Sequence, residues 1–569
     1  LSQRQAMLES FLEDEFDFEK DGQWRIDRKD EPYPKNEDEA KETWRLKIKF
    51  DLLTLKLAGN TDQEAKDRLL KRIRSVWKDY SQYTDDDVVA LYLNALTRAY
   101  DPHSTYMAAE DLRNFDISIK LSLDGIGAVL RWEDGYTVVN SIIPGGAAAR
   151  HGKLVVDDRI IAVAQGTEPF ESVIDMRLNE VVELIRGQRG TTVRLQVMRK
   201  NENGFDTLNF AIVRDKIILK DGEAKAEIFE PTASTEESPS AYRIGVIELP
   251  SFYVDFNDRR QNPNNYKSSS RDVRTHLEQF KRDGVDGVIL DLRNNGGGGL
   301  DEAITMAGLF VGRKPIVIVR QASGARITVH RSREEAIYEG PLLVMLNRFS
   351  ASASEILAGA MHDYQRAILV GDRTTFGKGT VQNIVQLPEG YGALKVTIAQ
   401  FYRVSGWSTQ NRGVETDMIL PSINNARDLG ESTLENALPW KAISPISYTP
   451  VGNIRRYINE LQQYSHDRLS KDTDFKEIEE NVQEFLTNVK PLEYTSILKM
   501  QEDAAKRKEE RDEEIASADK TMENTTRENS EEEKSSNEET TIRSDAYLLE
   551  SMAILEDYIR LQQRVEVKN

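Results

Sequence analysis

The spacing of hydrophobic and polar positions changes along the chain, and these changes divide it into regions. Residues 1–110 place apolar residues at helical spacing between charged ones, as in WRLKIKFDLLTLKLAG, which predicts a helical N-terminal region. From about 118 to 200 the pattern becomes short strands separated by glycine turns, with one helical stretch at 176–187. We therefore expect a compact β-rich module over residues 115–202.

The middle of the chain alternates buried-type strands with helices. Apolar runs such as GVILDL and PLLVML have the length of strands and are followed by helical stretches. This alternation favours a layered α/β core with partly parallel strands, whose functional loops gather at the strand ends. We expect this core to cover residues 203–435.

Helical spacing returns in the C-terminal region, residues 436–569. A polar and acidic stretch at about 505–543 is nearly devoid of apolar residues, so we expect a solvated linker there. The last helical stretch carries apolar residues on one face, at Leu548, Met552, Leu555 and Ile559. We expect this face to pack back on the helical region.

Composition narrows the classes of function. With 569 residues, 39% of them hydrophobic, the chain can bury several cores. A net charge of −20 argues against a nucleic-acid partner, and no apolar run approaches the roughly 18 residues of a membrane span. The absence of cysteine excludes disulfides and thiol chemistry. The sequence starts at Leu1 without a signal-peptide pattern, so we expect that an export signal has been removed.

The segment NRFSASASEILAGAM, residues 347–361, places three serines at alternate positions ahead of a helical run. Ser352 and Glu355 form an S-x-x-E capping box, which is a structural explanation. A helix N-terminus also offers free N–H groups that stabilise an oxyanion, so a capping serine can also be a nucleophile. On the pattern alone, Ser350 and Ser354 are equal candidates.

A nucleophilic serine needs a base, and the histidines offer none nearby. The six histidines show no metal-type spacing, so we expect no metal site. His362 lies ten residues after Ser352, which is about 15 Å along a helix and too far for proton abstraction.

Lys378, in GDRTTFGKGTVQ, is the other candidate base. The segment is not a phosphate loop, because Gly371 and Gly377 enclose five residues and Gly379 stands where Ser or Thr would bind magnesium. If burial lowers the pKa of Lys378, a Ser-Lys dyad is chemically plausible, although a surface lysine in a glycine turn is the commoner case.

Several segments in order carry a family resemblance: YDPHSTYM, LDLRNNGGGGL, RFSASASE, GKGTVQ and FYRVSGWSTQNRGVETDMILPS. Together they resemble the tail-specific, or C-terminal processing, serine proteases, over roughly residues 95–445. The resemblance implies a multidomain α+β protein with a crotonase/ClpP-like α/β layered protease core and an inserted PDZ-like module. It also implies a serine endopeptidase without cofactors, exported to the periplasm.

The resemblance assigns roles to individual residues. It implies that Ser352 is the nucleophile, Lys378 the general base and Gln382 the residue that orients the lysine. Asp363 matches an acidic position sometimes grouped with the catalytic set, but it lies about a helix length away, so we expect it to support the structure.

Oxyanion donors in this family come from the residue after the nucleophile, here Ala353, and from the glycine-rich loop, here Gly297 or Gly298. Glycine suits this place because a side chain would block the approach of a substrate carbonyl to the backbone N–H.

The β-rich module resembles a PDZ domain, with a carboxylate-binding loop at Gly125, Ile126, Gly127 and Ala128. Its adjacent N–H groups can hold a terminal carboxylate while the ligand adds as a strand. The implied partners are protein or peptide substrates with apolar C-termini, together with an adaptor protein as a further candidate partner.

Two other functions fit the sequence less well. A PDZ scaffold with an inactive core is favoured only if Ser352 or Lys378 is missing, and both are present. A β-lactamase-type amidase requires S-x-x-K, but Glu355 occupies the fourth position.

Overall fold

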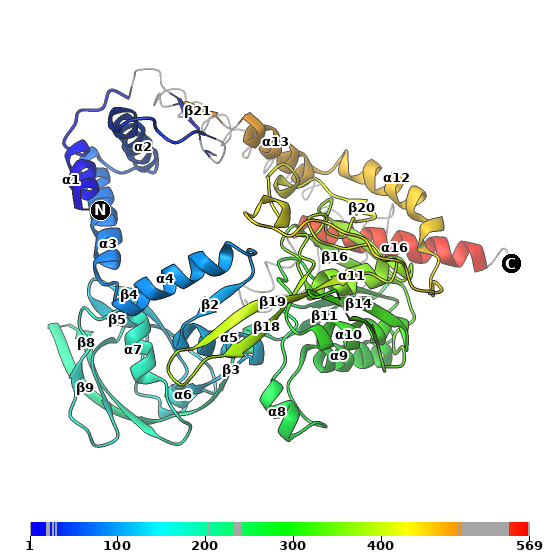
Figure 1. The fold of residues 1–569 in the computed structure, drawn as a ribbon, viewed down its shortest axis with the longest axis horizontal. Helices are drawn as coiled ribbons and strands as arrows, with labels where there is room; N and C mark the ends of the chain where they lie inside the picture. The colour runs from blue at the N-terminus through cyan, green and yellow to red at the C-terminus, as the bar shows by residue number, and fades with distance from the viewer. Residues whose placement is uncertain are drawn as a thin grey trace, which may run out of the picture. The chain divides into compact units, whose positions relative to one another are not determined.

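The chain folds into two compact units. Figure 1 shows the helices and strands that make them up. The computed structural model describes residues 2–18, 23–25, 28, 31–202, 204–230, 242–324, 326–487, 489–491 and 545–566. The first unit comprises Leu1–Val89, Pro421–Arg427 and Ser465–Leu549, and the second comprises Ala90–Leu420, Asp428–Tyr464 and Glu550–Asn569. None of the described helices combines the length and apolar content that a bilayer span requires.

The first unit is mainly helical, as the spacing of its apolar residues predicts. Its helices are α1 (Ser2–Phe11), α2 (Glu37–Leu57), α3 (Asp62–Ser81) and α13 (Thr473–Thr487), with a short antiparallel pair of β1 (Gln23–Arg25) and β21 (Val489–Pro491) and a 3-10 turn η2 (Ile423–Asn425). The Asn36 side chain caps α2 by accepting the Glu39 N–H at 2.8 Å. Ile48, Leu52 and Leu69 are in the small core between α2 and α3. Helices α4 (Asp85–Arg98) and α12 (Ile458–Leu469) contribute residues to both units.

The β-rich module in the second unit contains a main antiparallel sheet, a separate antiparallel pair of strands formed by its first and last strands, and two helices. Its elements are β3 (Ser122–Gly125), β4 (Ala128–Glu133), β5 (Tyr136–Ile142), α6 (Ala147–His151), β6 (Arg159–Gln165), β7 (Glu171–Ser172), α7 (Leu178–Ile185), β8 (Thr192–Asn201), β9 (Gly204–Val213) and β10 (Asp215–Ile218), preceded by α5 (Ala109–Lys120). The strand order is β4-β5-β6-β8-β9, so β4 is at an edge. Val193, Leu195 and Val197 of β8 alternate in burial and point into the core of the module. Helix α7, which contributes to the same core, corresponds to the helical stretch predicted at 176–187.

The module extends past its predicted end at residue 202. Strand β9 pairs with β8 from Thr192 opposite Val213 to Asn201 opposite Gly204. The predicted boundary therefore falls at the tip of a hairpin, and the second strand of a hairpin belongs to the same sheet as the first.

The core of the second unit is a six-stranded sheet covered by helices, which confirms the predicted α/β layers. In sheet order its strands are β11 (Lys225–Phe229), β12 (Ile244–Glu248), β13 (Gly287–Asp291), β16 (Leu342–Leu346), β17 (Ile368–Gly371) and β20 (Met418–Ile419), parallel from β12 onward. The helices of this region are α8 (Phe256–Gln261), α9 (Ser269–Asp283), α10 (Leu300–Val311) and α11 (Ala353–Asp363), with 3-10 turns η1 (Lys220–Gly222), η3 (Glu431–Thr433) and η4 (Ile454–Arg456).

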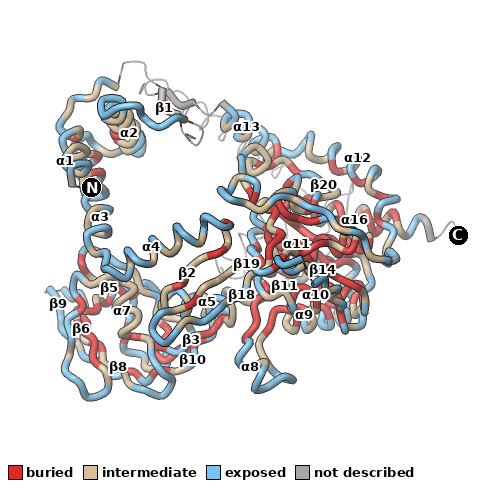
Figure 2. The backbone as a smooth tube through the Cα atoms, viewed as in Figure 1, coloured by how far each residue is buried: buried red, intermediate tan, exposed pale blue. Residues whose placement is uncertain are grey.

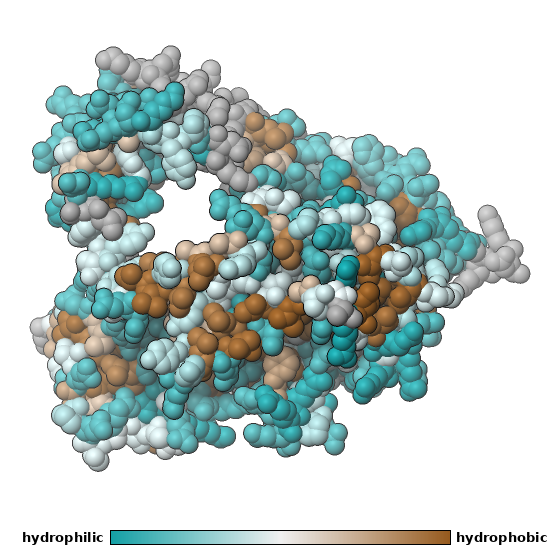
Figure 3. Space-filling view, viewed as in Figure 1, coloured by the Kyte–Doolittle hydropathy of each residue, from teal (hydrophilic) through white to brown (hydrophobic). Residues whose placement is uncertain are grey.

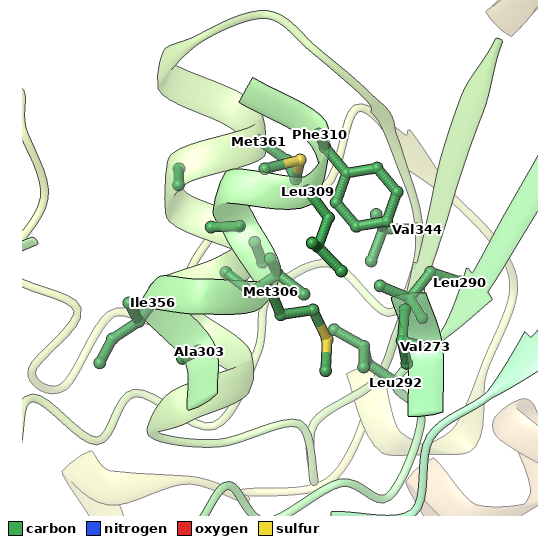
Figure 4. Packing of buried hydrophobic residues seen from close by; sticks show 14 of the residues in the cluster. Val273, Leu290, Leu292, Ala303, Met306, Leu309, Phe310, Val344, Ile356 and Met361 are labelled. Carbon is green, nitrogen blue, oxygen red and sulfur yellow. The ribbon is translucent and has the colours of Figure 1, made fainter. Parts of the chain in front are cut away.

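Burial explains why these strands read as continuous apolar runs. Every residue of β13 and β16 is buried, and the buried backbone is concentrated in this core (Figure 2). Leu309 and Phe310 of α10 pack near Leu290 and Val344 of the sheet (Figure 4).

The second unit also contains another sheet, which is antiparallel. It consists of β14 (Pro315–Gln321), β15 (Ile327–Arg331), β18 (Thr380–Gln386) and β19 (Ala393–Tyr402), in the order β15-β14-β19-β18, with β2 (Thr105–Met107) paired to β19. Strand β2 lies within the region 1–110 that reads as helical, because three residues are too few for a spacing to show. Exposed Val385 and Ile398 add to the apolar surface of the β18–β19 hairpin (Figure 3).

The C-terminal helix α16 (Ala546–Glu566) packs on the helical region, as expected, and also on the core sheet. At its start Tyr547 packs edge-on against Phe475 of α13. Further along, a Cβ built on Gly287 of β13 would be 2.9 Å from Leu555 and 3.2 Å from Ile559. Tyr558 also packs edge-on against Tyr457. The acidic stretch at about 505–543 lies outside the described residues.

Candidate active site

Ser352 occupies a sharp turn between strand β16 and helix α11. Its backbone has φ 59° and ψ −109°, in the positive-φ region that non-glycine residues rarely adopt. Such local strain is characteristic of functional turns, and a strand-to-helix turn of this kind holds its side chain clear of both elements.

The structure distinguishes the three alternating serines. Ser350 is fully buried and donates its hydroxyl to the carbonyl of Leu292 at 2.8 Å, and Ser354 is fully buried and donates to the carbonyl of Asn295 at 2.8 Å. Ser352 is partly exposed and makes no side-chain capping hydrogen bond. Of the three hydroxyls, that of Ser352 is therefore the one left available for chemistry.

The glycine-rich loop after β13 touches this turn. Gly297 has φ 104°, and a Cβ at this position would be 2.8 Å from Ser352 Cβ and 3.0 Å from Ala353 N, so only glycine fits. Asn295 holds the loop: its buried side chain donates to the carbonyl of Leu249 at 2.7 Å and accepts the Gly297 N–H at 2.9 Å. Sequence reasoning missed Asn295, although a polar residue next to the glycines was a signal.

The two predicted glycine donors differ in their hydrogen bonds. The Gly297 N–H is engaged by Asn295, whereas among the described residues no partner accepts the Gly298 N–H. Phe252 holds this stretch in place, because its N–H donates to the Gly297 carbonyl at 2.9 Å and its carbonyl accepts the Gly299 N–H at 2.8 Å. The N–H of Ala353, the first residue of α11, also has no intrahelical acceptor.

Glu355 joins the serine turn to the lysine loop. Its fully buried carboxylate accepts the N–H groups of Ser352 at 2.8 Å and Lys378 at 2.9 Å, both at Oε2. Its other oxygen accepts from the Gly377 N–H at 2.7 Å and from the Thr375 hydroxyl at 2.6 Å. Burial raises the pKa of Glu355 to about 7 against the effect of these hydrogen bonds. Glu355 thus makes its half of the predicted capping box, the bond to the Ser352 N–H, and it also fixes the lysine loop.

Lys378 has the electrostatic setting of a base. The pKa of Lys378 is lowered to about 8, first by burial and second by the charge of Lys395. The negative charges of Glu431, Glu355 and Asp101 raise this pKa but do not outweigh burial. Among the described residues, no hydrogen bond or ion pair reaches the Lys378 amine. Glu355 brings the backbones of Ser352 and Lys378 together, and no hydrogen bond joins the Ser352 hydroxyl to the Lys378 amine.

Gln382 lies on β18, four residues after Lys378. Its Nε2 donates to the hydroxyls of Thr380 at 2.9 Å and Thr397 at 3.1 Å, and Thr397 in turn donates to Asp101 Oδ1 at 2.7 Å. These bonds fix the amide group and leave its oxygen, Oε1, without a partner among the described residues. No hydrogen bond to Lys378 is formed in this structure.

Asp363 is the last residue of α11, about 15 Å from Ser352 by helix length. It pairs with Arg403, whose Nε is 3.2 Å from Oδ2, and accepts from the Ser405 hydroxyl at 3.0 Å. Burial alone would raise the pKa of Asp363, but His362 and Arg403 hold it below its usual value. The structure does not bring Asp363 or His362 to the serine. The described residues also contain no cluster of three or more acidic or histidine side chains that could hold a metal.

The predicted tail-binding loop, residues 125–128, connects β3 to the edge strand β4. The carbonyls of Ile126 and Gly127 accept the N–H groups of Ala148 at 2.7 Å and Ile143 at 2.9 Å, and Gly127 has φ 77°. These bonds fix the loop beside an edge strand, where unpaired backbone groups can receive an added strand.

Protein-family models cover most of the chain. Residues 243–420 match peptidase family S41, and residues 116–198 match the PDZ domain. Residues 1–110 match the tail specific protease N-terminal domain, and residues 424–560 match the C-terminal domain of tail specific protease.

Curated relatives agree with these models, and similar solved structures exist for part of the chain. The tail-specific protease of Haemophilus influenzae is 39% identical over 484 residues, which is 83% of this chain and 66% of that protein. The carboxy-terminal processing protease CtpA of Bacillus subtilis is 31% identical over 376 residues, 64% of this chain and 72% of that protein. The PDZ domain of a carboxy-terminal protease from Vibrio cholerae, solved in complex with a peptide, is 44% identical and covers 17% of this chain and 98% of that one, with a TM-score of 0.17. This chain spans about two thirds of the length of the Haemophilus protein.

Proposed function

Because the chain belongs to peptidase family S41, the C-terminal processing peptidases, we propose that it is a serine endopeptidase that uses Ser352 as nucleophile and Lys378 as general base. One observation carries this proposal. A single carboxylate oxygen of Glu355 accepts the backbone N–H groups of both residues, so the loops that bear them are tied together. In the same turn, the Ser352 hydroxyl makes no capping hydrogen bond to helix α11.

The reaction begins with proton transfer to neutral Lys378. With a pKa of about 8, roughly a tenth of the lysine is neutral at pH 7. The amine takes the proton of the Ser352 hydroxyl, and the serine oxygen attacks the substrate carbonyl carbon. Substrate binding must close the distance between the two groups, because catalytic hydrogen bonds often tighten only in the complex. The free Oε1 of Gln382 then accepts from the ammonium and orients it.

The negative oxygen formed by this attack needs N–H donors. We assign them to Ala353 and Gly298, because the N–H of Gly297 is already engaged by Asn295. Both sit beside the N-terminus of α11, whose dipole favours negative charge. When the tetrahedral intermediate collapses, Lys378 returns its proton to the leaving amine. A water, deprotonated by the same lysine, then hydrolyses the acyl-enzyme.

The PDZ domain selects substrates by an apolar C-terminal tail. In this proposal the tail adds as a strand to β4, and the loop at 125–128 holds its terminal carboxylate through backbone N–H groups. Val129, 44% exposed on β4 next to this loop, offers apolar surface that a nonpolar tail would cover. We place the enzyme in the bacterial periplasm on the strength of the family resemblance.

The test is cleavage of one model protein carrying either an apolar or a charged C-terminal tail. Mass spectrometry of the products should show that the apolar-tailed form is degraded and the charged-tailed form persists. The Ser352→Ala variant, prepared in parallel, should leave both intact. Equal cleavage of the two forms by the wild-type enzyme would contradict tail selection, and cleavage by the variant would contradict the assigned nucleophile.

A further inference from the structure

Buried polar side chains hold the backbone on both sides of Lys378, in the loop between β17 and β18. The Lys378 N–H donates to Glu355 at 2.9 Å, and the Lys378 carbonyl accepts the Thr409 hydroxyl at 3.1 Å. The next N–H, that of Gly379, donates to Gln410 Oε1 at 2.8 Å. Thr409 and Gln410 are fully buried. The direction in which the lysine side chain leaves the loop therefore depends on these three partners.

Glu431, in the 3-10 turn η3, fixes one of these partners. The Gln410 amide donates to Glu431 Oε1 at 2.9 Å and to the carbonyl of Leu438 at 3.0 Å. The N–H of Glu431 also donates to the carbonyl of Phe376, in the lysine loop, at 3.0 Å. Glu431 thus supports the loop twice, directly at Phe376 and through Gln410 at Gly379.

The carboxylate of Glu431 is fully buried, and His103 provides a second side-chain donor to it. Nε2 of His103 lies 2.7 Å from Glu431 Oε2, and the histidine side chain is 16% exposed. A carboxylate can only accept, so Nε2 carries the hydrogen in this pair. A buried carboxylate that loses such a donor becomes costly and shifts towards other partners. A hydrogen-bonded chain therefore runs from His103 through Glu431 and Gln410 to the lysine loop.

The same YDPHSTYM segment reaches the lysine's other proposed support, Gln382. The buried Asp101 carboxylate accepts the N–H groups of His103 and Ser104 at 3.0 Å each and the Thr397 hydroxyl at 2.7 Å. The Thr397 hydroxyl in turn accepts from the Gln382 amide at 3.1 Å. One short segment is thus bonded, by two separate routes, to the lysine loop and to the amide proposed to orient the lysine.

We propose that His103 is a positioning residue for the general base: by donating to Glu431 it fixes Gln410, and Gln410 fixes the backbone next to Lys378. Proton transfer requires the amine to be placed accurately, and a displacement of about 1 Å can cost roughly a hundredfold in rate. Asp101 holds the backbone of His103, so the lysine loop and Gln382 keep a constant relation to each other. The inference rests on the proposed dyad, because His103 acts only through Lys378.

The test compares two substitutions of His103 in the full-length enzyme. His103→Gln keeps an N–H near the place of Nε2, whereas His103→Leu keeps most of the volume and has no donor. His103→Leu should lower kcat for a peptide roughly tenfold with little change in KM, and His103→Gln should retain most of kcat. If His103→Leu fails to fold, His103→Asn, whose amide is too short to reach Glu431, takes its place. Equal kcat in the Gln and Leu variants, or a change in KM alone, would overturn the role of His103.

The matched control is His276→Leu. This histidine of α9 is also partly buried, and its Nε2 lies 3.3 Å from the carbonyl of Ala224, outside the chain of bonds to the lysine. His276→Leu should leave kcat unchanged, and a loss equal to that of His103→Leu would show a general effect of removing a histidine.

A double substitution tests whether His103 acts through Gln410. Gln410→Met removes the acceptor of the Gly379 N–H, so adding His103→Leu to it should lower kcat no further. Losses that multiply would overturn the proposed route. Lys378→Ala, measured in parallel, separates this inference from the dyad. An inactive Lys378→Ala beside a fully active His103→Leu refutes the role of His103 alone, whereas an active Lys378→Ala refutes the dyad and the inference with it.

Discussion

The two ends of helix α11 each hold a buried carboxylate, and the two carboxylates differ in their hydrogen-bond partners and in their pKa values. At the C-terminal end, Asp363 is paired with Arg403 and accepts from Ser405, and its pKa is held low. At the N-terminal end, Glu355 accepts mainly backbone N–H groups, has no ion-paired cation among the described residues, and has a pKa near 7.

In the proposed function, the Asp363 end of the helix supports the fold and the Glu355 end supports the chemistry. At the Asp363 end, each charge meets an opposite charge, which stabilises the fold. At the Glu355 end, the fold leaves a hydroxyl on Ser352 and an amine on Lys378 without partners among the described residues. Uncompensated groups of this kind cost folding free energy, and perturbed pKa values that result from them are typical of active sites.

The largest expected effect is the loss of either member of the dyad. Ser352→Ala and Lys378→Ala should each reduce kcat/KM for a peptide substrate by at least about a thousandfold, because the two residues act as one proton-transfer unit. Circular dichroism should show an intact fold. Ser354→Ala, a buried serine of the same segment, is the matched control and should retain activity. A Lys378→Ala enzyme with more than a few per cent of wild-type activity would contradict the dyad.

Substitution of the two carboxylates should have different effects: one on catalysis at the Glu355 end of the helix and one on stability at the Asp363 end. Glu355→Gln replaces an acceptor with an amide whose NH₂ faces backbone N–H donors, so we expect kcat/KM to fall about ten- to a hundredfold. Asp363→Asn breaks a buried ion pair and should lower the free energy of unfolding by about 3 kcal/mol. Its kcat/KM should change little at temperatures where it is folded. Denaturant titration and steady-state kinetics on both variants check this, and the reverse pattern would invalidate the comparison.

Damage to the tail-binding loop should affect selection more than chemistry. A Cβ at Gly127 would be 3.1 Å from Ile217 and 3.2 Å from Gly146, and its φ of 77° disfavours side chains. Gly127→Val should therefore raise KM for an apolar-tailed protein roughly tenfold and lower kcat far less. Gly152→Val, with φ 71° but nothing within 4 Å of its Cβ, tests for general backbone strain. An unchanged tail preference in Gly127→Val would exclude this loop.

The smallest effect expected is a gain in stability. The pKa of Lys378 falls from 10.5 to about 8 on folding, so the folded protein binds this proton more weakly than the unfolded chain does. The lysine therefore destabilises the fold below pH 8, and the cost fades as the pH rises from 8 towards 10.5. Lys378→Met should raise the free energy of unfolding by roughly 1 kcal/mol at pH 7 and by nothing near pH 11. Urea titrations at both values measure it; a variant less stable at pH 7 would contradict an unpaired buried charge.

The ordered motifs predict the segments of the candidate site, and their family resemblance singles out Ser352, but the serine pattern alone does not make that choice. The alternation of Ser350, Ser352 and Ser354 gives all three the same spacing. Only the folded structure shows that the Ser350 and Ser354 hydroxyls donate to backbone carbonyls and that the Ser352 hydroxyl does not. Glu355 reads as a helix cap, because its contact with the lysine loop depends on tertiary folding.

The central claim is that Lys378 activates Ser352, and covalent labelling tests it most directly. A serine-reactive fluorophosphonate applied to the folded enzyme should give one adduct, which peptide mass spectrometry should locate at Ser352 rather than at Ser350 or Ser354. In Lys378→Ala the rate of labelling should fall at least about a hundredfold, because the hydroxyl has lost its base. An adduct on another residue, or equally fast labelling of the variant, would contradict the account.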